Sequence, residues 1–312
     1  MKLFVTGGTG FIGAAFVPLA LSAGHSVHLL TRSEEAAAKW RERGVTPVLG
    51  DLRALGDWQR GAAECDALVH LAQPETFGAR ITQARADAYR ENRLRMDSHL
   101  LETLGPGHQR VLYVGGTSYI GEQGKELRDE TVTPNPKGWG PYIAPAIEKV
   151  GEYRRRGLPI VEAFPGAVYG PGSWFAEYGL RPLKEGRRVL GVRGPSRYTS
   201  AIHLMDCARA LLHLLEHGEA GQRYFLVDDE PVRFADLVRC AADALGVPLQ
   251  KLLLPKLLIR LAMGPVVLDS VTTEYRLSNA RLRATGFRCE FPTVREGVPD
   301  VVRRWLAQRG EG

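Results

Sequence analysis

Short apolar runs alternate with longer amphipathic stretches through the first half of the chain. The period of the amphipathic stretches predicts helices over residues 11–23, 33–44 and 55–64, and a longer one ending near residue 104. The apolar runs predict strands over residues 2–7, 26–32, 46–52, 67–72, 110–116 and 158–170. This alternation favours an α/β fold with a parallel sheet covered by helices on both faces.

Two kinds of residue mark the helix boundaries. Gly24 and Gly44 stand where helices are expected to end. Pro18 lies inside the first predicted helix, where a proline costs about 3 kcal/mol. We expect that helix to continue through Pro18 with a bend.

The turn after the first predicted strand carries the sharpest chemical signal. TGGTGFIG (residues 6–13) contains Gly7, Gly10 and Gly13 in a G-x-x-G-x-x-G pattern, directly between a strand and a helix. The first glycine allows the tight turn, the second lets a pyrophosphate approach the backbone, and the third allows close helix packing. Backbone N–H groups at the helix N-terminus then donate to the phosphates. The pattern predicts a Rossmann-type, doubly wound sheet that binds a dinucleotide, with further contacts from Thr9, Phe11 and Ile12.

The end of the second strand is expected to select the cofactor. Thr31, Arg32 and Ser33 stand where an acidic residue would bind the free ribose of NAD. Arg32 can form a bidentate contact with a 2′-phosphate, so the sequence favours NADP. NAD stays open as the alternative, with Glu34 or Glu35 on the ribose.

The strand–helix rhythm changes after Gly170. Residues 171–199 are rich in Gly, Pro, Arg and aromatic residues, whereas residues 223–230 again resemble a strand and residues 234–246 a helix. We expect a dinucleotide-binding domain over residues 1–170 plus about 200–228. A smaller C-terminal α/β cap domain is expected over about 171–199 plus 229–312.

Composition excludes several other classes. The 312 residues are 44% hydrophobic and 24% charged, as in ordinary globular proteins. The longest apolar segment, residues 252–268, contains Pro255, Lys256, Arg260 and Pro265, so we expect a buried or surface-packed helix and no membrane partner. The four cysteines show no C-x-x-C spacing, which predicts reduced thiols in a cytoplasmic protein.

The net charge of +6 raises the question of an anionic partner. Lys and Arg are scattered without a long tract, so a small anionic ligand explains the surplus and no nucleic-acid partner is expected. His25 and His28 fall on opposite faces of a strand, so we expect no metal site there.

With these residues identified, the chain resembles the extended short-chain dehydrogenases/reductases of the NAD-dependent epimerase/dehydratase family. TGGTGFIG matches the family's glycine loop. The other matching segments are GDL (50–52), VHLAQP (69–74), FPGAVYGPG (164–172), IHLMDCARAL (202–211) and LSNARLRATGF (277–287). The resemblance implies cofactor contacts from Asp51, Leu52, Leu71, Ala72, Gln73 and Pro165. It also implies a homodimer and an oxidoreductase, epimerase or dehydratase activity on a small carbonyl, alcohol or sugar-type substrate.

The resemblance breaks at the catalytic triad. The family uses a Ser or Thr after the fifth strand, a Tyr as general acid/base, and a Lys four residues beyond it. Tyr142 matches the tyrosine, but Ala146 occupies the lysine position and Gly116 the hydroxyl position. Thr117 and Ser118 are the candidate substitutes for the hydroxyl. A nearby cation normally shifts a tyrosine from its ordinary pKa of about 10 towards working pH, so turnover here is expected to be slow or greatest at high pH.

Local geometry leaves the catalytic competence open. Pro145 is expected to start the helix, which would leave Tyr142 in the preceding loop. Lys149 is a candidate replacement cation, or a solvated surface lysine. The alternative function is a catalytically impaired, NADP-binding sensor or regulatory protein.

The remaining candidates have ordinary structural interpretations beside functional ones. His70 is expected to be buried and hydrogen-bonded, with contact to cofactor or substrate as the alternative. Asn92 resembles a family asparagine near the active site, with an ordinary helix-surface residue as the alternative. Four cap residues are candidates for stacking on a flat ligand or for internal packing: Trp174, Phe175, Tyr178 and Arg181.

Overall fold

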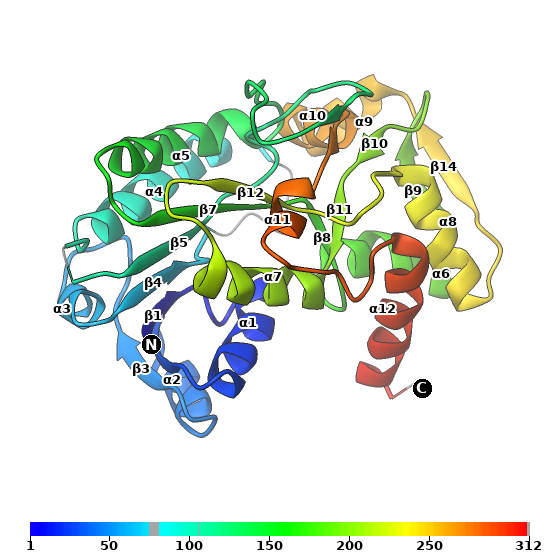
Figure 1. Ribbon diagram of the computed structural model, residues 1–312. Coiled ribbons are helices and arrows are strands. Elements are labelled where there is room, and N and C mark those ends of the chain that lie inside the picture. Colours follow the sequence, from blue (N-terminus) through cyan, green and yellow to red (C-terminus); the bar gives the residue numbers. More distant parts are fainter. Residues whose placement is uncertain (75–80, 106, 311–312) are drawn as a thin grey trace.

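A seven-stranded sheet forms the centre of the molecule in the computed structural model, which describes residues 1–74, 81–105 and 107–310 (Figure 1). All of its strands are parallel. In order across the sheet they are β12 (Arg223–Leu226), β7 (Ile160–Pro165), β5 (Arg110–Val114), β4 (Ala67–His70), β1 (Lys2–Thr6), β2 (Ser26–Thr31) and β3 (Thr46–Leu49). The predicted α/β fold with a Rossmann-type parallel sheet is confirmed.

Helices cover both faces of this sheet. One face packs against α1 (Phe11–Ser22), α2 (Glu34–Arg41) and α7 (Leu204–His217). The opposite face packs against α3 (Trp58–Ala63), α4 (Gln83–Leu101) and α5 (Gly140–Arg155). Helix α1 is continuous through Pro18, as expected.

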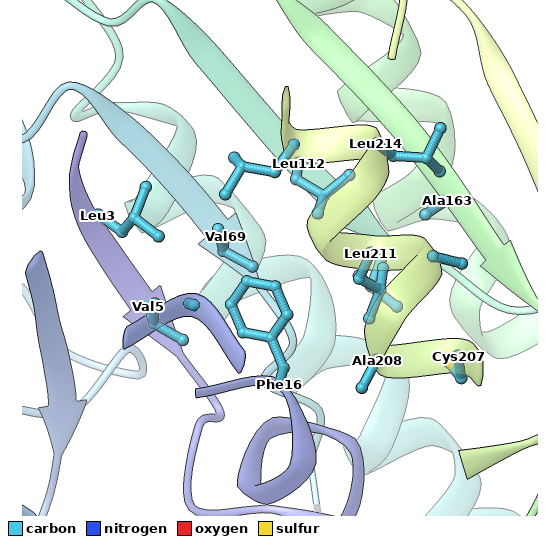
Figure 2. Packing of buried hydrophobic residues seen from close by; sticks show 14 of the residues in the cluster. Leu3, Val5, Phe16, Val69, Leu112, Ala163, Cys207, Ala208, Leu211 and Leu214 are labelled. Atoms are coloured by element: carbon cyan, nitrogen blue, oxygen red, sulfur yellow. The ribbon is translucent and has the colours of Figure 1, made fainter. Parts of the chain in front are cut away.

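Strand side chains alternate between the two cores. In β1, Leu3 and Val5 join the core beneath α1 and α7, whereas Phe4 joins the core beneath α3 and α4. Figure 2 shows the first core, where Phe16 of α1 and Leu211 of α7 meet over the strand side chains. Because both faces are buried, the strands are apolar at nearly every position, which is why short apolar runs marked them in the sequence.

The start of α5 corrects one expectation. The helix was expected to begin at about Pro145 but begins at Gly140, so Tyr142 lies in its first turn. The N–H groups of Tyr142 and Ile143 both donate to the carbonyl oxygen of Trp139, at 3.0 and 3.2 Å. Pro141 suits the first turn, and packing of Ile143, Ile147 and Val150 outweighs the cost of Pro145.

The rest of the chain contains a third core, separate from the two on the sheet. Its helices are α6 (Arg181–Lys184), α8 (Phe234–Leu245), α9 (Lys256–Met263), α10 (Pro265–Thr272), α11 (Ala280–Ala284) and α12 (Val294–Gln308), with the short π-helix η1 (Ala176–Leu180). Its two-stranded pairs are β8 (Ala167–Tyr169) with β11 (Ala201–His203), β9 (Val189–Val192) with β14 (Lys251–Leu254), β10 (Tyr198–Thr199) with β13 (Val232–Arg233), and β6 (Leu127–Arg128) with β15 (Arg276–Leu277). The core joins η1, α8 and α12 through Phe175, Leu237 and Val298.

Candidate active site

The glycine turn packs its backbone tightly at the carboxyl end of β1. Gly7 has a φ of +72°, and a Cβ there would lie 2.4 Å from the backbone nitrogen of Ala72. A Cβ on Gly13 would lie 2.2 Å from the carbonyl oxygen of Gly7. Gly10 caps α1 without a side-chain oxygen, so the first N–H groups of α1 can donate to a phosphate. These residues fit a pyrophosphate group.

The other predicted cofactor residues line the same edge of the sheet. Arg32 follows β2 and is exposed, and Asp51 and Leu52 follow β3. A hydrogen bond from Arg53 lowers the pKa of the Asp51 carboxyl, and the charge of Arg32 acts in the same direction. Arg32 therefore lies close enough to Asp51 for their charges to interact.

Strands β4 and β7 contribute their carboxyl ends to this edge. The N–H of Leu71 donates to the carbonyl oxygen of Thr6 at 3.0 Å, which holds Leu71 and Ala72 beside the glycine turn. Pro165 ends β7, and its carbonyl oxygen accepts from the N–H of Thr117 at 3.3 Å. Thus the structure gathers the sequence-predicted cofactor residues along one edge, as expected of parallel strands.

A cavity of about 130 Å³ opens between α4, α5 and the ends of β4 and β5. It is lined by Gln73, Tyr89, Arg93, Gly115, Gly116, Ser118, Trp139, Ile143 and Ile147. Most of this surface is apolar, with a hydroxyl, an amide and a guanidinium among the lining groups. The mixture suits a small, mostly apolar molecule held by a few polar contacts.

The three candidate catalytic side chains occupy different positions around the cavity. Ser118 lines it. Thr117 is buried, and its hydroxyl donates to Tyr275 Oη at 3.4 Å. Tyr142 follows Trp139 and precedes Ile143, both lining residues, but its hydroxyl donates to Gln83 Oε1 at 3.3 Å. The structure therefore brings Ser118 to the cavity and leaves Tyr142 and Thr117 outside its lining.

Neither Ala146 nor Lys149 of α5 lines the cavity. Ala146 is 1% exposed. Lys149 is half-buried, and its Nζ donates to Ser98 Oγ of α4 at 2.9 Å. Lys149 thus joins α5 to α4, which differs from both expectations for it, a catalytic substitute and a solvated lysine.

Sequence reasoning missed Arg93, which is the cation of the described cavity lining. Arg93 is 2% exposed, and its Nε donates to Asp97 Oδ2 at 3.1 Å. Two further hydrogen bonds reach the ends of β4 and β5: Nη1 donates to the carbonyl oxygen of Ala72 at 3.0 Å, and Nη2 donates to Tyr113 Oη at 2.8 Å. The signal lay in the spacing, since Arg93 falls on the stripe of α4 that also carries buried Tyr89 and Leu100.

Asp97 and His70 complete a buried polar network with Arg93. Burial alone would raise the pKa of the Asp97 carboxyl, but the Arg93 charge and hydrogen bonds from His70 and Tyr113 hold it below the ordinary value. Burial lowers the pKa of His70, against the opposing charge of Asp97, which favours the neutral ring. His70 Nε2 lies 2.9 Å from Asp97 Oδ1 and Nδ1 lies 2.7 Å from Thr6 Oγ1. The predicted buried, hydrogen-bonded role of His70 is confirmed.

The other candidates lie away from the cavity lining. Asn92 is half-buried on α4 beside Arg93. Phe175 is fully buried in the third core, and Trp174 stacks on Phe234 with ring centres 6.0 Å apart. Arg181 pairs with Glu177. Trp174 and Phe175 thus pack within the protein, whereas Arg181 pairs at its surface.

Comparison with known proteins agrees with this geometry. A model of the NAD dependent epimerase/dehydratase family matches residues 3–226. A farnesyl-dihydroquinoline-oxide ketoreductase of Stigmatella aurantiaca is 29% identical over 251 residues, 79% of this chain and 74% of the relative.

Solved structures share the fold over nearly the whole chain. Human epimerase family protein SDR39U1 with NADPH has a TM-score of 0.78 at 23% identity, covering 97% of this chain and 99% of that one. A dTDP-glucose 4,6-dehydratase of Streptomyces venezuelae with NAD has a TM-score of 0.80 at 22% identity, covering 99% and 98%.

The parallel sheet and the glycine turn define a Rossmann-type α/β protein. The chain belongs to the NAD dependent epimerase/dehydratase family. Together the matches support a nicotinamide-dependent oxidoreductase or epimerase.

Proposed function

We propose that this protein is an NADP(H)-dependent oxidoreductase that interconverts a small, largely apolar ketone and its alcohol. The observation that carries the proposal is the position of the cavity lined by Ser118, which lies at the same sheet edge as the glycine turn. The S. aurantiaca relative is named as a ketoreductase, which supports this reaction class. A bound nicotinamide ring would supply or accept the hydride.

The protein's own groups have separate roles in this proposal. Backbone N–H groups at the start of α1 hold the pyrophosphate, and Ser118 Oγ donates to the substrate oxygen. Tyr142 is the proposed proton donor, which requires its hydroxyl to exchange Gln83 for the substrate. The lining side chains Ile143, Ile147 and Trp139 exclude water and favour an apolar substrate.

Turnover by variants of Tyr142 and Ser118 tests the proposal. NADPH consumption is measured on a panel of apolar ketones, with reduced product identified by mass spectrometry. We expect Tyr142→Phe to lower kcat/KM by about 10²-fold or more, because a general acid is lost. Ser118→Ala should also lower kcat/KM, because a hydrogen-bond donor to the substrate oxygen is lost. Tyr153→Phe is the control, because Tyr153 lies on α5 about three turns beyond Tyr142, with the Arg156 guanidinium 5.4 Å from its ring centre. Unchanged kcat/KM in Tyr142→Phe would remove Tyr142 from the mechanism.

The preference for NADP is tested at Arg32. Arg32→Asp is expected to raise the Kd for NADPH by about 10- to 100-fold, because it removes a charge-assisted contact to the 2′-phosphate. The Kd for NADH, which lacks that phosphate, should stay the same or fall. Arg239→Asp on α8 is the control with the same change in net charge. Tighter binding of NADH than NADPH by the unaltered protein would contradict the preference.

The second candidate function is an NADP-binding sensor or regulatory protein without catalysis. It is favoured by the buried Ala146 at the lysine position and by the engagement of Tyr142 with Gln83. This function predicts saturable NADPH binding without consumption on any ketone of the panel. Product formation that depends on Ser118 or Tyr142 would exclude it.

A further inference from the structure

An exposed apolar face covers β14 and α9. Leu257, Leu258 and Leu261 of α9 are 65%, 50% and 58% exposed, and Ile259 is the residue of this helix that is buried. The exposed apolar residues of these two elements form the leucine face: Leu252, Leu253, Leu257, Leu258, Leu261 and Met263. Scattered exposed leucines are ordinary, but a contiguous group of this kind marks an interaction surface.

Positive charge is interleaved with the leucine face. Lys251, Lys256 and Arg260 are exposed on the same two elements. Residues 245–268 contain no Asp or Glu. A short amphipathic element with leucines and cations has the composition of a segment that lies in a membrane interface.

The leucine face adjoins the wall of the proposed active site. The N–H of Ile81 donates to the carbonyl oxygen of Met263 at 3.2 Å, just before α10 begins. On α10, Val266 packs in one apolar cluster with Ile81, Trp139 and Tyr142. Figure 1 shows α9 and α10 together at the top of the molecule, near one end of α5.

We propose that the leucine face docks this protein onto an anionic lipid bilayer surface. The leucines enter the interface while Lys251, Lys256 and Arg260 contact lipid phosphates. A second copy of the chain fits less well, because a twofold interface would oppose this patch to itself and bring the cations together. This proposal differs from the sequence-based expectation of no membrane partner. It concerns the surface of the protein, since no helix in the described ranges is long and apolar enough to cross a bilayer.

Vesicle sedimentation of the full chain tests the docking. Vesicles of phosphatidylcholine alone are compared with vesicles that also contain phosphatidylglycerol. The unaltered protein should sediment with the mixed vesicles and be released by high salt. Combined Lys256→Glu and Arg260→Glu changes should weaken binding about 30-fold or more, because each cation near an anionic surface contributes about fivefold in affinity.

The apolar contribution needs a matched control. The triple variant Leu257→Ser, Leu258→Ser and Leu261→Ser should lose binding to the mixed vesicles. Leu49→Ser, Leu55→Ser and Leu127→Ser replace leucines of similar exposure elsewhere, 48%, 62% and 55%, and should bind like the unaltered protein. Thermal unfolding and NADPH binding verify that every variant is folded.

Three results would overturn the proposal. The first is failure of the unaltered protein to sediment with the mixed vesicles. The second is an equal loss in the control triple variant. The third is a dimer in light scattering that the leucine-face variant converts to monomer, without lipid binding by either protein, which would assign the face to a second copy. Failure of the proposed ketone reduction would not change the sedimentation result, because sedimentation does not depend on catalysis.

Discussion

Replacing Gly7 with alanine is expected to lower the free energy of unfolding by about 3 kcal/mol, because alanine is strained in the left-handed backbone conformation and its Cβ overpacks the turn. The new Cβ would lie 2.4 and 2.6 Å from the backbone N and Cα of Ala72. Backbone atoms cannot move as a flexible side chain can, so the turn must shift away from β4. The same shift moves the N–H groups that face the phosphates, and NADPH binding is expected to fall below detection. Urea unfolding and fluorescence titration with NADPH measure the two effects.

Gly44→Ala is the matched control for this substitution. Gly44 has a similar φ of +81°, but a Cβ there would meet nothing within 4 Å. It should cost about 1 kcal/mol from backbone strain and leave NADPH binding unchanged. Equal destabilisation by Gly7→Ala and Gly44→Ala would mean that the close approach to Ala72 does not constrain the turn.

Replacing Arg93 with methionine is expected to lower the free energy of unfolding by about 3–5 kcal/mol. The substitution keeps most of the side-chain volume but leaves the buried Asp97 carboxylate without its guanidinium partner. It also removes the donors to Ala72 and Tyr113, which join α4 to the ends of β4 and β5. Urea unfolding at pH 7 measures the loss.

Arg90→Met provides the comparison on the same helix. Arg90 pairs with Asp87 at 3.6 Å, with side chains 44% and 35% exposed. Solvent screens this pair, so its loss should cost less than about 1 kcal/mol. If Arg93→Met lowers the free energy of unfolding by no more than Arg90→Met does, the buried network does not stabilise the fold. The double variant Arg93→Met with Asp97→Leu should recover part of the loss, because no unpaired charge remains.

The elements that could be predicted from sequence are those with a strong local signal. The strand over residues 2–7 and the glycines after it were recognised because an apolar run and a tight turn each depend on neighbouring residues. The strand over residues 26–32 corresponds to β2 (Ser26–Thr31) in the same way. The predicted cofactor residues were then placed together by the parallel order of the strands.

The sequence-based predictions were wrong or incomplete where contacts between segments distant in the chain outweighed the local conformational preference of a residue. Pro145 favours a helix start, yet α5 begins five residues earlier because its apolar face packs on the sheet and α4. Arg93 was overlooked because a charged residue on an apolar stripe gains its stability from Asp97 and Tyr113, two groups brought to it by folding.

The sequence by itself determined the α/β class, the glycine turn and the alanine at residue 146, since each depends on the residue itself or on its neighbours in the chain. Only the tertiary structure decided that Ser118 lines a cavity, that Lys149 turns to Ser98, and that the leucines of α9 stay exposed. The physical reason is that burial and pairing are set by segments far apart in the chain, whose approach depends on the packing of the whole molecule.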